Sequence, residues 1–417
     1  MSMPVKPDWR YRCLFTLLTP LLAWHSIAQA RRADDARMAR QKLGKDLPQR
    51  DDRPVWIHMA SVGEVNAAYP LVMALRQQFP QLPLLVSTFT PTGAATAHKR
   101  LGEEIEHVYL PLDMDRAVQA FFECIKPRCA LIMETEIWPR LCYHCRRHDI
   151  PLLIVNGRLS RRSMDKPRWV RAIYARALQN VDRVLARSET DAQRFAALGM
   201  AQDRIQVIDN IKFAATPAAQ QVTPVRLPRP YVLAASTHDD EELQLSRAWL
   251  RSSLARDYLL VIVPRHPRRK GAILQQLRPL SDQVAVRSED DELTAHTRIY
   301  LADTFGELPG FIAGAELVCM GGSFIPRGGQ NVIEVARLGK VALFGPHMDN
   351  FADERDLLLA DEAAVEVQDA TALMDQITAL LARPEPLAEM GERARQMVAG
   401  KADVAQRYLQ ALQPYLS

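Results

Sequence analysis

Residues 54–87 read PVWIHMASVGEVNAAYPLVMALRQQFPQLPLLVS, which is two apolar runs separated by a helical pattern. The runs at 54–59 and 83–87 are short and continuous, which is typical of buried strands. Between them the apolar side chains recur at helical spacing: Val65, Ala68, Tyr69, Leu71, Val72 and Leu75. This order predicts two parallel strands joined by a helix.

The same alternation of strands and helices continues along the chain. Further strands of a first series are predicted at residues 107–110, 129–133, 151–155, 183–187 and 205–208. A second series is predicted at residues 231–235, 258–263, 283–287, 298–302, 316–320 and 341–344, and helical patterns close the chain from about 370 to 412. This alternation indicates an α/β protein with two parallel sheets covered by helices.

A break between the two series divides the chain. Residues 214–230 contain four prolines and little periodicity, which predicts a linker. We expect one Rossmann-like domain at 41–213 and another at 231–400, preceded by an N-terminal segment at 1–40 and followed by a helix at 401–417. In doubly wound sheets, ligands bind beyond the carboxyl ends of the strands, so residues that follow each strand are the candidates for chemistry.

Composition and charge are those of a soluble globular protein. Hydrophobic residues make up 48% and charged residues 24% of the 417 residues, and the formal net charge is +4. So small a charge gives no indication of nucleic-acid binding, but it is compatible with an anionic substrate or membrane surface. Six cysteines without a dense framework are typical of reduced thiols in the cytosol.

Two patterns resemble metal sites, and we interpret neither as one. Four cysteines cluster in the first half: Cys124, Cys129, Cys142 and Cys145. They could bind zinc, but Cys129 lies in the apolar run 129–133, which favours buried thiols. Asp113-Met114-Asp115 matches the Asp-x-Asp pattern of metal-dependent glycosyltransferases, and we interpret it as a turn and helix cap.

Residues 13–28 (CLFTLLTPLLAWHSIA) are apolar and have basic side chains on both sides. The run is shorter than the ~20 residues that cross a bilayer comfortably, and Pro20 interrupts it. A cleaved secretory signal would have this form, and Ala28-Gln29-Ala30 loosely fits its cleavage site. A membrane-surface anchor would instead use the flanking arginines to bind acidic headgroups. Dense positive charge after the run disfavours export, so we favour the anchor.

Acidic residues follow two predicted strands of the first half. Glu64 comes after strand 54–59, where a carboxylate either complements the helix dipole or acts as a general base. Glu134 and Glu136 directly follow strand 129–133. Burying unpaired charge is costly, so this pair implies a cationic partner or a functional role.

Basic residues follow strands in both halves. Residues 158–168 hold five basic side chains, which form either a solvated helix face or a grip on a phosphorylated acceptor. Arg265 and His266 follow strand 258–263, where a donor phosphate could lie.

Glycine-rich turns follow strand 316–320. Gly322 and Ser323 come first, and residues 327–331 then lead into a helix whose N–H groups form a ready anion site. Glu334, one turn into that helix, could accept hydrogen bonds from ribose hydroxyls.

Several short motifs occur in a fixed order along the chain: Ser61-Val62-Gly63-Glu64, Thr90-Pro91-Thr92-Gly93, Met133-Glu134-Thr135-Glu136-Ile137-Trp138-Pro139, Arg158-Leu159-Ser160, Ser236-Thr237-His238, Pro264-Arg265-His266-Pro267, Asp303-Thr304-Phe305-Gly306-Glu307-Leu308, Gly321-Gly322-Ser323 and Phe344-Gly345-Pro346-His347. In order and number they resemble the 3-deoxy-D-manno-octulosonic acid (Kdo) transferases of lipopolysaccharide assembly, over nearly the whole chain. The resemblance implies a GT-B glycosyltransferase, with two Rossmann-like doubly wound domains facing each other across a cleft.

The resemblance also implies substrates and roles. The first half would bind the lipid A precursor (lipid IV-A) and the second half CMP-Kdo, with no metal or cofactor and with inversion at the anomeric carbon. Glu64 would be the general base, while Glu134 and Lys212 would stabilise the transition state. The residues implied to hold cytidine monophosphate (CMP) are Arg265, His266, Phe305, Gly306, Glu307, Asn331 and Glu334. The family's N-terminal segment is a membrane anchor, which implies the cytoplasmic side of the inner membrane.

The chain departs from the family pattern at several positions. The family usually has Gly-Gly-His-Asn-Pro before its ribose-binding acid, where this chain has Gln330 and Val332. Near Lys212, Asp209 replaces the usual glycine and Ala214 the usual aspartate. The alternatives are another GT-B enzyme that uses a UDP- or ADP-sugar, and an exported two-lobed binding protein.

Overall fold

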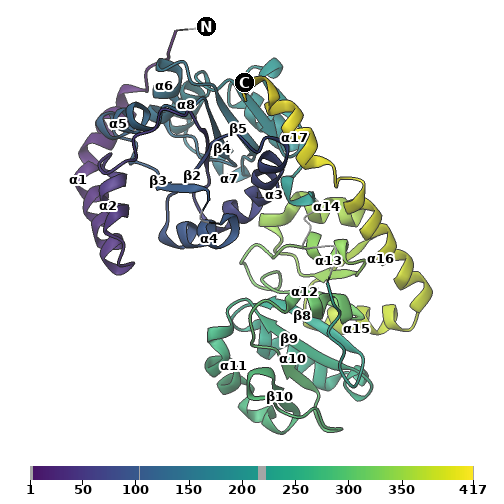
Figure 1. Cartoon of the computed structure of the whole chain (residues 1–417). Helices are drawn as coiled ribbons and strands as arrows, with labels where there is room; N and C mark the ends of the chain where they lie inside the picture. Colours follow the sequence, from purple (N-terminus) through teal and green to yellow (C-terminus); the bar gives the residue numbers. More distant parts are fainter. Residues whose placement is uncertain (1–2, 103, 215–221, 417) are drawn as a thin grey trace. The chain divides into compact units, whose positions relative to one another are not determined.

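The computed structural model describes residues 3–102, 104–214 and 222–416, which form two compact units (Figure 1). Of the described residues, those up to 214 and from 403 onward form the first unit, and residues 222–402 form the second. Within the predicted linker 214–230, residues 215–221 lie outside the described part of the chain.

The first unit is built on a parallel seven-stranded sheet. Its strands are β1 (Val55–His58), β2 (Leu84–Thr88), β3 (Glu106–Tyr109), β4 (Cys129–Met133), β5 (Leu152–Gly157), β6 (Arg183–Ala186) and β7 (Ile205–Val207). They lie in the order β3-β2-β1-β4-β5-β6-β7, so the chain reverses its direction of travel between β1 and β4. Such a switch point opens a crevice at the carboxyl ends of the two strands.

Helices cover this sheet. They are α1 (Trp9–Arg32), α2 (Ala36–Lys42), α3 (Val62–Gln78), α4 (Pro91–Leu101), α5 (Asp115–Ile125), α6 (Pro139–Arg147), α7 (Arg161–Met164), α8 (Arg168–Leu178), α9 (Glu189–Ala197) and α17 (Val404–Leu412), with 3-10 turns η1 (Gln202–Arg204), η2 (Ile211–Phe213) and η9 (Gln413–Tyr415). Trp56 of β1 packs on Phe121 and Phe122 of α5, with ring centroids 4.7 and 5.9 Å away.

The C-terminal helix α17 belongs to the first unit, although the second unit precedes it in the sequence. It lies beside α3 (Figure 1). Its buried Tyr408 donates a hydrogen bond to the Asp209 carbonyl at 2.9 Å. The last helix therefore supports the segment that carries Lys212.

The second unit repeats the plan with a second parallel seven-stranded sheet. Its strands are β8 (Tyr231–Thr237), β9 (Leu259–Pro264), β10 (Val284–Val286), β11 (Ile299–Leu301), β12 (Leu317–Met320), β13 (Ala342–Phe344) and β14 (Ala364–Glu366). The order is β10-β11-β9-β8-β12-β13-β14, which places the switch point between β8 and β12.

Helices also cover the second sheet. They are α10 (Glu241–Arg251), α11 (Lys270–Leu277), α12 (Leu308–Gly314), α13 (Ile333–Arg337), α14 (Ala352–Ala360), α15 (Ala370–Leu381) and α16 (Pro384–Ala399), with 3-10 turns η4 (Ser253–Arg256), η5 (Pro267–Arg269), η6 (Arg278–Gln283), η7 (Arg287–Glu289) and η8 (Asp349–Phe351). Trp249 of α10 is fully buried in the core, in one cluster with Leu260 and Ile377.

Every strand predicted from the sequence is present within one or two residues. The structure adds β14, a half-buried edge strand of three residues. So short a run gives too few positions for an alternation of apolar and polar side chains to be recognised. The α/β prediction with two parallel sheets is therefore confirmed.

Helix α1 is longer than the predicted apolar run 13–28 and continues through Pro20. By length and composition it is apolar enough to cross a membrane. The N-terminal end of α1 is hydrogen-bonded to the first unit. The Tyr11 hydroxyl donates to Asp113 at 2.5 Å, and buried Arg140 donates to the Arg12 carbonyl at 3.3 Å. Large apolar side chains are exposed along it: Trp9, Leu14, Leu17, Leu18, Leu21 and Trp24.

Candidate functional site

Glu64 lies at the switch point of the first sheet, in the first turn of α3. Its carboxylate accepts hydrogen bonds from the Ala60 N–H at 2.8 Å and the Ser61 hydroxyl at 3.1 Å. Burial, followed by the charges of Glu134 and Glu136, raises the pKa of Glu64 to about 8. A carboxyl group with such a pKa exchanges protons near neutral pH, which suits a general base.

Glu134 and Glu136 lie in the turn after β4, the strand beside β1. Glu134 has a left-handed backbone, with φ of 56°, and its N–H donates to the Val155 carbonyl at 2.9 Å. Glu136 accepts a hydrogen bond from the Trp138 indole at 2.8 Å, and burial raises its pKa. The structure thus brings the predicted acids together with Glu64.

Lys212 follows β7 in the 3-10 turn η2. The Asn210 side chain caps this turn by accepting the Lys212 N–H at 3.1 Å. Asp209 occupies the position at which the resemblance predicts glycine. Its φ is 86°, and its side chain forms an ion pair with Arg407 of α17 at 2.9 Å. Glycine adopts a positive φ more readily than other residues, which explains why it is usual at this position. In this chain the ion pair with Arg407 helps to stabilise the aspartate.

The Asp-x-Asp pattern has a structural role. Asp113 is buried and accepts the N–H groups of Arg140 at 2.9 Å and Leu141 at 2.8 Å, which belong to the first turn of α6. Asp115 lies in the first turn of α5 and forms an ion pair with Arg140 at 3.2 Å. Asp113 therefore caps α6, a different helix from the one that follows it in the sequence.

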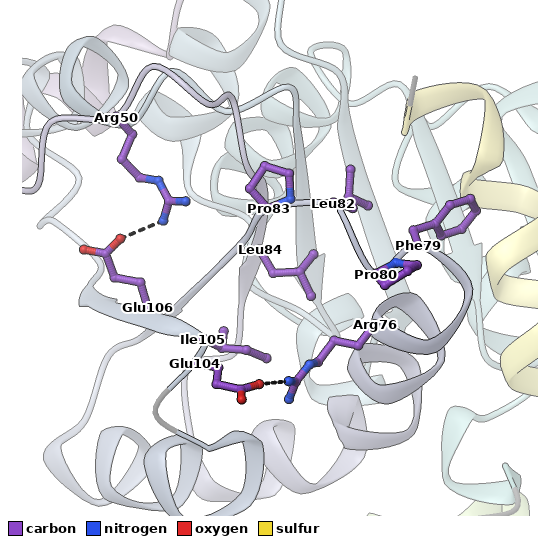
Figure 2. A pocket seen from close by; sticks show the side chains of 10 residues that line it. All are labelled: Arg50, Arg76, Phe79, Pro80, Leu82, Pro83, Leu84, Glu104, Ile105 and Glu106. Carbon is purple, nitrogen blue, oxygen red and sulfur yellow. Dashed lines mark hydrogen bonds and ion pairs between the residues drawn. The ribbon is translucent and has the colours of Figure 1, made fainter.

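A pocket of about 470 Å³ lies at the opposite, amino-terminal edge of the first sheet (Figure 2). Leu84 and Glu106, the first residues of β2 and β3, contribute to its wall. Its two arginines are already paired, Arg50 with Glu106 at 2.7 Å and Arg76 with Glu104. The pocket is therefore separate from the Glu64 site.

In the second unit, Arg265 and His266 follow β9 and are both exposed. The His266 ring lies 6.1 Å from that of His238, which follows β8. Gly322 follows β12 with φ of 68°. These residues lie at the carboxyl ends of three neighbouring strands, where a nucleotide is expected in a sheet of this kind.

Ser323 is fully buried, and its hydroxyl is committed to the protein. It donates to the Met320 carbonyl at 2.5 Å and accepts the Gly345 N–H at 2.8 Å. This side chain therefore supports the loop, and the loop's backbone is the part suited to contact a ligand.

The turn 304–307 follows β11 and presents Phe305 to solvent, with 75% of its surface exposed. Gly306 has φ of 86°, a conformation that favours glycine. Glu307 forms two hydrogen bonds with the Arg287 guanidinium, at 2.6 and 2.7 Å, which lower the pKa of that carboxyl group.

Asn331 and Glu334 lie at the start of α13, where the Asn331 amide donates to Glu334 at 3.2 Å. Glu334 is exposed and accessible to a ligand. Gln330, which replaces the usual histidine, contacts His238 at 3.1 Å between their Nε2 atoms. Val332, which replaces the usual proline, is buried with φ of −77°, an angle that proline also adopts.

The sequence of this chain is similar to those of known proteins of one family. The profile described as "3-Deoxy-D-manno-octulosonic-acid transferase (kdotransferase)" matches residues 33–215. The 3-deoxy-D-manno-octulosonic acid transferase of Bordetella pertussis is 34% identical, and that of Haemophilus influenzae is 31% identical, each over 87% of both chains. The chain belongs to the Kdo transferase family. It is therefore a glycosyltransferase, which excludes the alternative of an exported binding protein.

Solved structures share the fold of this Kdo transferase family member at low identity. A glycosyltransferase from Rickettsia africae matches with a TM-score of 0.61 and 14% identity, over 87% of this chain and 98% of that one. UDP-GlcNAc 2-epimerase from Neisseria meningitidis, bound to UDP-GlcNAc, matches with a TM-score of 0.59 and 14% identity, over 87% of this chain and 100% of that one. These similarities confirm the predicted GT-B fold.

Proposed function

We propose that this enzyme transfers Kdo from CMP-Kdo to a hydroxyl group of the lipid A precursor, lipid IV-A, with inversion at the anomeric carbon. The observation that carries the proposal is Glu64, a carboxyl group whose pKa is raised to about 8 at the switch point of the first sheet. Membership of the Kdo transferase family supports Kdo as the sugar that is transferred.

In the proposed reaction Glu64 removes the proton of the acceptor hydroxyl. The resulting oxygen attacks the anomeric carbon of Kdo, a new glycosidic bond forms, and the bond to CMP breaks. Glu134 and Lys212 are proposed to stabilise the charge that develops in the transition state. A single displacement of this kind inverts the anomeric configuration.

The second unit is proposed to bind the donor. Arg265 offers positive charge and His266 a ring N–H donor to the CMP phosphate, and Gly322 lies at the same edge of the sheet. Phe305, Gly306 and Glu307, together with Asn331 and Glu334, are proposed to contact the nucleoside. No metal or cofactor takes part in this proposal, because cationic side chains meet the leaving phosphate.

Helix α1 is proposed to hold the enzyme on the cytoplasmic face of the inner membrane. Its exposed side chains include Leu17, Leu21 and Trp24. Arginines occur at both ends of the helix: Arg10, Arg12, Arg31 and Arg32. Apolar side chains among flanking arginines suit a membrane with acidic headgroups, where the acceptor lipid resides.

The test is an assay of the detergent-purified full chain with CMP-Kdo and a tetraacyl lipid A precursor. We expect CMP release together with an acceptor product heavier by one or more Kdo residues in mass spectrometry. Parallel reactions with UDP- and ADP-sugars test the alternative donors. They are included because Gln330 and Val332 depart from the family's usual donor-site sequence. Transfer from one of those sugars without CMP release from CMP-Kdo would contradict the proposal.

A further inference from the structure

Glu241 and Glu242 occupy the first turn of α10, directly after β8. Both side chains are fully buried, with an exposed fraction of 0%. Two adjacent buried carboxyl groups are costly unless the protein supplies hydrogen bonds in place of water. Their hydrogen bonds therefore indicate what the pair does.

Glu241 binds the loop that follows β12. Its Oε2 atom accepts the N–H groups of Gly322 at 2.7 Å and His238 at 2.9 Å. Its Oε1 atom accepts the N–H of Phe324 at 3.2 Å. Hydrogen bonds from N–H groups to a carboxylate are among the stronger ones in proteins. One side chain thus joins the ends of the neighbouring strands β8 and β12.

Glu242 points to the other side of β8. Its Oε1 atom accepts hydrogen bonds from the Thr237 hydroxyl at 3.0 Å and from Arg269 at 2.8 Å. Arg269 ends the turn η5 that follows β9, and it also binds Asp239 at 2.9 Å. This carboxyl group therefore joins β8 to its other neighbour, β9.

Glycines let the loop after β12 come this close. A Cβ atom added to Gly321 would lie 2.5 Å from the Thr237 Cα atom, and Gly322 has φ of 68°. The Gly322 carbonyl in turn accepts the Gly329 N–H at 2.8 Å. The backbone position at Gly322 is therefore fixed by Glu241, by close packing and by the second glycine-rich turn.

We infer that Glu241 and Glu242 are positioning residues of the donor site, which set the loops after β9 and β12 at the spacing that a nucleotide phosphate requires. The inference rests on the proposed function, because Arg265, His266 and Gly322 lie in those loops. The two acids themselves are buried and act through the loops. The partners of Glu241 in the loop after β12 are more than 80 positions away in the sequence, so the pattern of residues around α10 gives no sign of this contact.

The experiment compares Glu241→Gln with the matched control Asp240→Asn. Asp240 lies at the same helix start, is exposed and accepts a hydrogen bond from Gln244 at 2.7 Å. Its φ of 78° is one that asparagine also tolerates. In Glu241→Gln an amide NH₂ faces at least one backbone N–H, so donor opposes donor and the loop loosens.

Two measurements use the full chain in detergent: amide hydrogen exchange and calorimetric binding of CMP. We expect Glu241→Gln to speed exchange in peptides covering 321–324 and to weaken CMP binding about tenfold. Saturating CMP should restore part of the protection, and KM for CMP-Kdo should rise while KM for the acceptor stays within about twofold. Asp240→Asn should leave exchange and CMP binding within about twofold of wild type.

Unchanged CMP binding and unchanged exchange at 321–324 in folded Glu241→Gln would overturn the inference. A wild-type protein that binds no CMP would contradict the proposed function instead, and the exchange comparison would still test the positioning role. If Glu241→Gln does not fold, Gly322→Ala decides the matter, because it strains the same turn and leaves Glu241 intact. Wild-type CMP affinity in that variant would also overturn the inference.

Discussion

Ser61 and Glu64 exchange hydrogen bonds at the start of α3. The Ser61 hydroxyl donates to the Glu64 carboxylate at 3.1 Å, and its oxygen accepts the Glu64 N–H at 3.5 Å. This reciprocal cap fixes the direction of the carboxyl group and lowers the pKa that burial raises. The proposed base is therefore held by its own helix cap.

Replacing Ser61 with alanine should weaken both functions of this cap. We expect a loss of about 1 kcal/mol of stability and a further rise of the Glu64 pKa, so that the acid limb of the rate–pH profile moves to higher pH. The matched control is Ser188→Ala, because Ser188 makes the same contacts with Asp191 at the start of α9. An unshifted limb in Ser61→Ala, or an equal shift in the control, would contradict this account.

Replacing Glu136 with glutamine should shift the acid limb of the rate–pH profile to lower pH. The charge of Glu136 raises the pKa of Glu64, so its removal should shift the limb to lower pH. Glutamine still accepts a hydrogen bond from the Trp138 indole. Glu123→Gln, an exposed substitution on α5, should leave the profile unchanged. A shift of the acid limb to higher pH in Glu136→Gln would contradict this account.

Glu64 also links stability to pH. Its folded pKa, about 8, lies above the ordinary value of 4.5, so the folded state binds this proton more tightly than the unfolded state. Stability is therefore lost as pH rises between these two values. Glu64→Gln, which cannot ionise, should be more stable than wild type at pH 8, by about 2 °C or more in Tm, with little gain at pH 4. An equal gain at both pH values would argue against a raised pKa.

Asp113 should matter for stability and not for metal binding. It accepts three hydrogen bonds, from Tyr11, Arg140 and Leu141. Asp113→Ala should therefore cost about 2–4 kcal/mol in denaturant unfolding. Chelation with EDTA should leave the transfer rate of wild type unchanged. A rate that falls with EDTA and returns with a divalent cation would revive the Asp-x-Asp interpretation.

The sequence predicted the strands and the acidic residues at their ends, because buried parallel strands leave continuous apolar runs. Contacts between distant segments left no such signal. Asp113 caps α6 rather than the helix beside it, and Glu241 binds Gly322, 81 positions away. The buried hydroxyl of Ser323 is a similar case, because its partner Gly345 follows the next strand. These contacts form because the order of the strands in the sheet makes neighbours of loops that are far apart in the sequence.

The most direct test of the central claim is single-turnover transfer from CMP-Kdo by wild type and by Glu64→Gln, with CMP affinity measured in parallel. Because a base must be deprotonated, the wild-type rate should rise with pH toward the Glu64 pKa of about 8. Glu64→Gln should lose about a thousandfold in rate and bind CMP as wild type does. A variant that keeps a tenth or more of the wild-type rate would show that another group takes the proton.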